Sequence, residues 1–182
     1  ELLRAPFPFE VPEAARGAEA ALCLPLVPAD PGAAPGAVLG DEAELYVAGP
    51  AARKWRLVGA LCSDLLAIGT AGPSPRQTAL LPRGRLGLSL DEPGHEGGFL
   101  PGHPAEMPGL ALLRDFLAYP DKAAFFTLSG LADAPGAGAP GPLMLRLFLG
   151  PRAAQALGRV ERGDIALNVV PAVNCFEALS EP

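Results

Sequence analysis

Alternating apolar and polar side chains indicate β-strands in several parts of the chain. Over residues 143–149, leucines occupy the odd positions, while Met144, Arg146 and Phe148 occupy the even ones. A two-residue period is typical of a strand that buries one of its two faces. The same period predicts two further strands, over residues 85–90 and 165–169.

Shorter apolar segments predict four more strands, over residues 20–27, 44–48, 124–129 and 2–9. The last of these contains Pro6 and Pro8. Proline has no N–H group to donate to a neighbouring strand, so this segment is expected at the edge of a sheet.

Two longer segments have the 3.6-residue period of a helix. The first is predicted to begin at Pro50, to run to Ile68 and to be capped by Gly69. Its apolar positions follow the i, i+3, i+4, i+7 spacing of a buried face. They are Val58, Leu61, Cys62, Leu65 and Leu66.

The second helix is predicted over residues 108–118 and ends before Pro120, because proline disfavours a helical conformation in the preceding residue. Its predicted buried face would contribute about 6–12 kcal/mol before the entropy of ordering. We expect Arg114 and Asp115 to face water, and Leu110, Leu113, Phe116 and Leu117 to be buried. A short third helix is predicted over residues 152–157.

The strands outnumber the helices and occur in runs, which predicts an α+β fold. We expect mostly antiparallel β structure, a sandwich or curved sheet of about 6–7 strands, with two main helices. Residues 1–182 are expected to form a single domain. Long loops rich in proline and glycine are predicted at residues 28–40, 69–84, 91–107 and 132–142.

Composition and charge narrow the functional classes. Hydrophobic residues make up 49% of the chain, which excludes an intrinsically disordered protein. The net charge of −6 disfavours binding to nucleic acids, which requires clustered Lys and Arg, and direct docking on anionic lipid. No apolar run approaches the roughly 20 residues that span a bilayer, so no membrane insertion is expected. Because the sequence begins at Glu1 without a methionine, we expect this chain to be an internal fragment of a longer protein.

No motif predicts a catalytic, metal or cofactor site. His95 and His103 lie in the acidic loop at residues 91–107, but the letters HEGGF do not match the HExxH zinc motif. GAGAPG at residues 136–141 has the letters of a dinucleotide-binding loop, yet a predicted strand follows it instead of a helix. No serine lies in a GxSxG motif.

Three cysteines, Cys23, Cys62 and Cys175, have apolar neighbours and no CxxC spacing. We predict that they are buried free thiols, as is typical of a reducing compartment. Trp55, which lies beside Lys54, is either an interface residue or a cover for the core of its own domain.

Three segments together resemble the TssF family (also called VasA or ImpG) of type VI secretion baseplate subunits. Residues 44–69 resemble its strand, glycine turn and long helix. Residues 109–131 resemble its helix followed by an aromatic-Pro-acidic-Lys sequence and paired phenylalanines, and residues 168–182 its Pro-Val-Asn-x-Phe-Glu ending. The candidate signature or interface positions are Trp55, Tyr119, Pro120, Lys122, Phe125, Phe126, Asn174 and Phe176.

The resemblance implies a structural, non-enzymatic component of the baseplate wedge, without cofactor or metal. Implied partners are TssG, TssK and TssE, and indirectly the spike hub and the sheath. The implied location is the cytoplasm, at the inner face of the bacterial inner membrane. The loop at residues 91–107 is predicted to be a contact surface in the wedge, and loops 28–40 and 132–142 to be disordered outside it.

Two alternatives remain open at the level of the sequence. A β-sandwich module that binds a ligand or carbohydrate would require an exposed aromatic platform. A hydrolase would require a deep pocket that joins His95 or His103 to carboxylate or hydroxyl groups.

Overall fold

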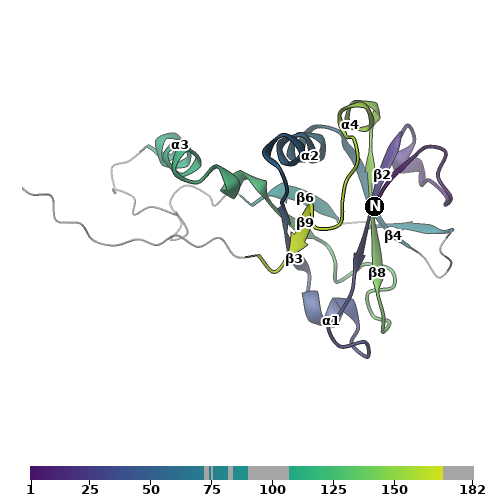
Figure 1. Cartoon of the computed structure of the whole chain (residues 1–182). Helices are drawn as coiled ribbons and strands as arrows, with labels where there is room; N and C mark the ends of the chain where they lie inside the picture. Colours follow the sequence, from purple (N-terminus) through teal and green to yellow (C-terminus); the bar gives the residue numbers. More distant parts are fainter. Residues whose placement is uncertain (72–73, 75, 82–83, 90–106, 170–182) are drawn as a thin grey trace, which may run out of the picture.

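The computed structural model describes residues 1–182 except residues 72–73, 75, 82–83, 90–106 and 170–182. The described strands form two sheets in which all neighbours are antiparallel (Figure 1). In spatial order, the five-stranded sheet contains β1 (Leu2–Arg4), β2 (Ala20–Leu26), β8 (Leu143–Leu149), β4 (Leu65–Ala71) and β5 (Thr78–Leu80). The four-stranded sheet contains β6 (Arg85–Leu88), β7 (Phe125–Ser129), β3 (Glu42–Val47) and β9 (Ile165–Leu167).

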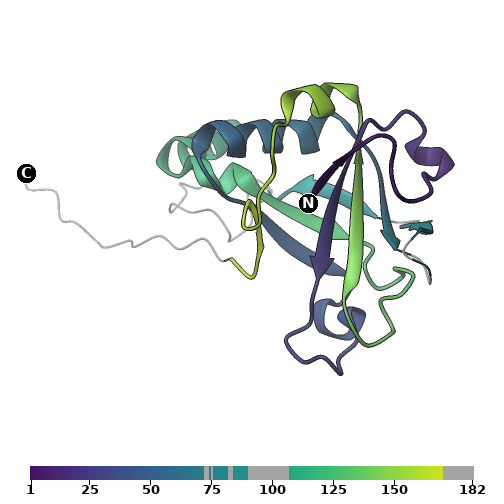
Figure 2. The ribbon, with the colours of Figure 1, turned by 45° about the vertical axis from the view of Figure 1, so that its right-hand side comes forward.

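Helices α2 and α4 lie side by side across one end of the two sheets (Figures 1 and 2). Helix α3 lies apart from the five-stranded sheet, to the left of α2 in Figure 1. Two antiparallel sheets with helices packed beside them confirm the predicted α+β fold of mostly antiparallel strands. The helical elements are η1 (Glu13–Ala15), α1 (Pro35–Leu39), α2 (Ala51–Ser63), α3 (Pro108–Ala118), η2 (Pro120–Ala124) and α4 (Pro151–Ala156).

One hydrophobic core joins both sheets and the two packed helices. The odd-numbered leucines of β8 lie in this core with Leu45 of β3 and Phe126 of β7. Leu57 and Leu61 of α2 cover the same core from the end of the sheets. Strand β1 lies at a sheet edge, as the prolines that follow it predicted.

The second face of β8 is also buried, which corrects the prediction of a half-buried strand. Phe148 is fully buried, and its ring makes edge-to-face contacts with Phe7 and Phe9 at centroid distances of 6.2 and 6.1 Å. The Arg146 guanidinium lies 3.9 Å from the centroid of the Phe9 ring. Burial lowers the pKa of Arg146. The segment before β2 therefore covers the outer face of the five-stranded sheet.

The first predicted helix is too long at its C-terminal end. Helix α2 ends at Ser63, whose hydroxyl donates to the Gly59 carbonyl at 2.7 Å, and β4 begins at Leu65. Strand β4 fills the position between β8 and β5, so tertiary pairing overrides the helical pattern. Gly69 is a strand residue in which a Cβ atom would lie 2.8 Å from the Ala79 carbonyl oxygen, so it permits strand pairing instead of capping a helix.

Two predicted loops contain packed structure, so the expectation that they are disordered is wrong. Residues 28–40 include α1, and in residues 132–142 both Ala134 and Ala137 lie in the core. The Gly36 N–H donates to the Ala137 carbonyl at 2.9 Å, and the Thr70 hydroxyl donates to the Pro135 carbonyl at 3.0 Å. The predicted contact loop at residues 91–107 lies outside the described residues except for Met107.

We predict that Phe148→Ala destabilises the fold by about 3–5 kcal/mol, because truncation leaves a cavity between Phe7, Phe9 and the sheet. Urea denaturation followed by circular dichroism measures this change. Val27→Ala is the control, since Val27 is 69% exposed and its truncation is expected to change stability by less than about 0.5 kcal/mol. Equal effects of the two substitutions would contradict the buried position of Phe148.

Candidate docking surface

Helix α3 exposes the apolar side chains that its pattern predicted to be buried. We call these side chains, together with that of the N-cap residue Met107, the α3 apolar face, and they are between 44% and 70% exposed. The prediction of a buried face is therefore wrong, although the bounds of the helix are confirmed. An exposed contiguous apolar patch on a protein surface is typical of an interaction site. The α3 apolar face consists of Met107, Leu110, Leu113, Phe116 and Leu117.

A buried ion pair explains why the polar side of α3 faces inward. Lys122 Nζ donates to Asp115 Oδ2 at 3.3 Å, and both side chains are 8% exposed. The predicted solvent position of Asp115 is therefore wrong. A charge that leaves water needs an opposite charge beside it, and η2 supplies that charge next to α3. With Asp115 turned inward, the 3.6-residue period places the leucines on the outer side.

A second polar cluster connects the α3–η2 corner to the core of the protein. Asp121 Oδ2 accepts a hydrogen bond of 2.9 Å from the Tyr46 hydroxyl of β3, and Asp121 Oδ1 pairs with Lys54 Nζ of α2. The Tyr46 ring also lies against Phe125, with 4.6 Å between centroids. One carboxylate thus joins β3, α2 and η2, and it fixes the base from which α3 extends.

The pKa shifts in this cluster follow from its geometry. The hydrogen bond from Lys54 lowers the pKa of Asp121, with a further contribution from Tyr46. Burial, together with the hydrogen bond to Asp121, raises the pKa of Tyr46 to about 12. At neutral pH, Asp121 is therefore a carboxylate and Tyr46 a neutral phenol. This arrangement binds structural elements together and offers no free base or nucleophile.

The structure distributes the candidate positions between the core and the surface. Phe125, Phe126 and Lys122 are buried, so their side chains support the fold from inside. Tyr119 caps the C-terminus of α3 and is partly buried, while Pro120 is exposed. Asn174 and Phe176 lie outside the described residues, so their predicted role stays a prediction.

Trp55 is partly buried and packs against the main core, as in the second of its two interpretations. The Lys54 ammonium lies 5.4 Å from the centroid of its ring. Cys23 is a buried free thiol as predicted, but Cys62 is exposed because it lies on the outer side of α2, which is a correction. Burial raises the pKa of both thiols. Cys175 lies outside the described residues.

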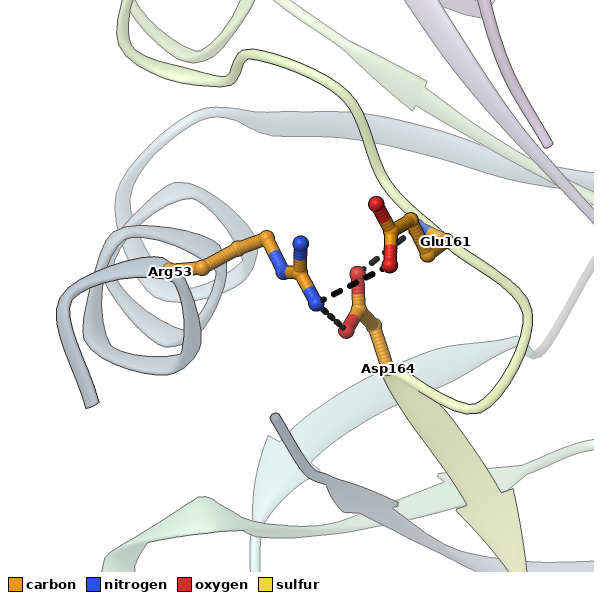
Figure 3. Close-up of polar contacts among 3 residues, drawn as sticks. All are labelled: Arg53, Glu161 and Asp164. Carbon is orange, nitrogen blue, oxygen red and sulfur yellow. Dashed lines mark hydrogen bonds and ion pairs between the residues drawn. The ribbon is translucent and has the colours of Figure 1, made fainter. Parts of the chain in front are cut away.

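A third polar cluster fixes the segment between α4 and β9 against α2 (Figure 3). Arg53 Nη2 lies 2.8 Å from Asp164 Oδ1 and 3.4 Å from Glu161 Oε2. Asp164 is buried, and its second oxygen accepts from the Glu161 N–H at 2.7 Å. Glycine is required at position 49 beside this cluster, because the φ angle of Gly49 is +93° and a Cβ atom there would lie 2.7 Å from Asp164 Oδ1. One guanidinium thus pairs with two carboxylates, and the cluster joins structural elements.

The sequence interpretation missed Lys54, Asp115 and Asp121 as determinants of this surface. The sequence did contain a signal for them, the Asp121-Lys122 dipeptide that follows Pro120. Charged side chains just after the end of a helix can contact side chains in its last turns. GAGAPG is followed by β8, as predicted from the sequence. His95 and His103 lie outside the described residues. Within the described ranges, no group of three His, Cys, Asp or Glu residues is arranged to hold a metal ion.

We predict that Asp121→Asn destabilises the fold by about 0.5–1.5 kcal/mol near pH 7, because the buried Lys54 side chain loses its carboxylate partner, while solvent at the 36% exposed Asp121 weakens the pair. The folded-state pKa of Asp121 is lowered, so its stabilising contribution is present above the pKa of an unfolded aspartate, about 4, and disappears as the pH falls through the folded value. Urea denaturation at about pH 7 and about pH 3 is therefore expected to give a smaller difference between wild type and variant at the lower pH.

The control for this experiment is Glu44→Gln, which removes an exposed carboxylate from β3, the strand that also carries Tyr46. It is expected to change stability by less than about 0.5 kcal/mol at either pH. An Asp121→Asn effect that is the same at both pH values would show that the charge of Asp121 does not stabilise the corner.

In the described parts of the chain, no helix has the length and apolar character to cross a membrane. A search among curated proteins found no match. The chain is similar to one in a solved structure, the TssK-TssF-TssG baseplate subcomplex of the type VI secretion system, with 19% identity and a TM-score of 0.50. The similarity covers 61% of this chain and 20% of that chain, so it spans about a fifth of the solved relative. The sequence profile described as "Type VI secretion system, TssF" matches residues 1–182, and the chain therefore belongs to the TssF family of the type VI secretion system.

Proposed function

We propose that this chain is a non-catalytic structural part of a type VI secretion baseplate wedge, and that the α3 apolar face is one of its docking contacts. The observation that carries the proposal is the exposure of this face in a TssF family member. Burying Leu113 and Leu117 in an interface would recover the hydrophobic free energy that the chain by itself leaves unused. The family match gives no support to a carbohydrate-binding module.

TssG is the partner that we propose for this face, because TssF occurs together with TssG and TssK in the similar solved complex. TssE is a further proposed neighbour, with the spike hub and the sheath as indirect partners. The site of action that follows is the cytoplasm, where the baseplate docks at the inner membrane. We also propose that residues 1–182 form one domain of a longer subunit, since both sheets share one core.

Rigidity of the α3 face supports a docking role. An interface gains affinity when its contact residues are held in position before binding. Here the Asp115–Lys122 ion pair holds the helix against η2, and Asp121 holds η2 against α2 and β3. The apolar side chains are therefore presented on a fixed helix, and little ordering entropy remains to be lost on binding.

We predict that the double substitution Leu113→Lys and Leu117→Lys in the full-length subunit abolishes or strongly weakens co-purification with TssG. Loss of a single apolar contribution of about 2 kcal/mol at the centre of an interface lowers affinity about thirtyfold, so the double substitution is expected to lower it by at least that factor. Both side chains are more than half exposed, so the change in unfolding free energy is expected to stay below about 1 kcal/mol. Pull-down from cells that co-express both subunits, with thermal unfolding in parallel, measures the two effects.

The matched control is Val27→Lys with Val38→Lys, which places the same charges at two exposed apolar positions of another surface. This variant is expected to retain TssG. Full retention of TssG by the α3 variant would refute the proposed role of this face. A folded α3 variant that loses TssG would support it.

A further inference from the structure

A surface groove lies between the N-terminal half of α2 and the segment that follows α4. It has a volume of about 370 Å³. Leu57, Leu157 and Val160 give it an apolar floor, and Pro50 is a further lining residue. Leu57 and Leu157 belong to the main core, so this floor is part of the rigid interior. The groove is separate from the α3 apolar face, and the two surfaces share no residue.

The groove is held open by the Arg53 cluster at its side. Arg53 lines the groove. Its Nη2 atom is bound to Glu161 and Asp164, in the segment that follows the groove residue Val160 (Figure 3). This tie fixes the distance between α2 and the segment before β9. The charge of Arg53 is thereby compensated by carboxylates of the same chain, and its side chain holds α2 against the segment before β9.

Two other arginines line the groove with uncompensated charge. Arg56 and Arg159 are exposed, and neither forms an ion pair or hydrogen bond within the described part of the chain. This local excess of positive charge is unusual in a chain with 20 acidic and 14 basic residues. The first turn of α2, which contributes Ala52 to the groove, contains no acidic residue and has no side-chain cap, so its helix dipole adds to the positive potential.

We infer that this groove binds an acidic peptide segment of another baseplate protein. An apolar side chain of that segment lies on the floor against Leu57 and Leu157, and flanking Asp or Glu carboxylates pair with Arg56 and Arg159. Arginine is suited to this role because its guanidinium forms two parallel hydrogen bonds to a carboxylate. The combination of apolar floor and charged rim favours a peptide over a free anion, which would leave the floor exposed to water.

The inference rests on the proposed assembly function in one respect, that the ligand belongs to a protein of the same machine. It concerns a different surface and a different recognition chemistry. Binding at α3 is dominated by apolar burial, whereas binding at the groove depends on charge and therefore weakens as salt screens the arginines. The two modes are separable by experiment.

The test uses the full-length subunit and fluorescently labelled short peptides tiled along the sequences of its co-expressed partners TssG and TssK. Fluorescence anisotropy is expected to identify at least one peptide that contains Asp or Glu beside an apolar residue. Arg56→Glu with Arg159→Glu is expected to weaken that binding by at least about tenfold, since two attractive charge pairs become repulsive. The control Arg76→Glu with Arg85→Glu introduces the same charge change at exposed positions elsewhere and is expected to leave binding unchanged.

The variant Leu113→Lys with Leu117→Lys separates this inference from the proposed function. It is expected to lose TssG in pull-downs but to bind the acidic peptide as wild type does. Absence of any binding peptide, selection of neutral or basic peptides, or equal weakening by the control pair would overturn the groove assignment. Retention of TssG by the α3 variant would instead refute the α3 proposal. It would not change the interpretation of the peptide-binding experiment at the groove.

Discussion

The buried charge of Asp115 determines which side of helix α3 faces the solvent. Once this carboxylate is inside, Lys122 must lie beside it, and the helix has one available orientation. That orientation turns the leucines and Phe116 outward. Asp121 extends the same principle to the core, because it accepts from Tyr46 and pairs with Lys54 of α2. Charge compensation at one corner thus fixes the position and the rotation of α3.

The rest of the domain supplies a rigid base for that corner. Strand β8 is buried on both faces, with leucines toward the shared core and Phe148 toward the N-terminal segment. Asp64 joins the end of α2 to α4, since its Oδ2 atom accepts from the Ala153 N–H at 2.7 Å. Asp164 joins α2 to β9 through Arg53. Buried or partly buried carboxylates therefore stabilise these connections, since each accepts a hydrogen bond or pairs with a basic side chain.

Two surfaces of the described part of the chain retain exposed groups that the fold itself does not use. The α3 apolar face lacks a cover, and the groove at Arg56 and Arg159 lacks counter-charges in the described chain. Because the chain belongs to the TssF family, we propose that both surfaces contact other proteins of the type VI secretion system.

The sequence by itself indicated most of the strands and the bounds of α3, because alternation and proline breaks act over a few residues, but it did not indicate β4 or β5. It also pointed to the family through Tyr119, Pro120 and the paired phenylalanines. The tertiary structure decided that residues 65–71 form a strand, since β8 needs a second neighbour, and that α3 turns its apolar face outward. Both decisions depend on pairing between residues distant in the fold, and a local hydrophobic period does not contain that information.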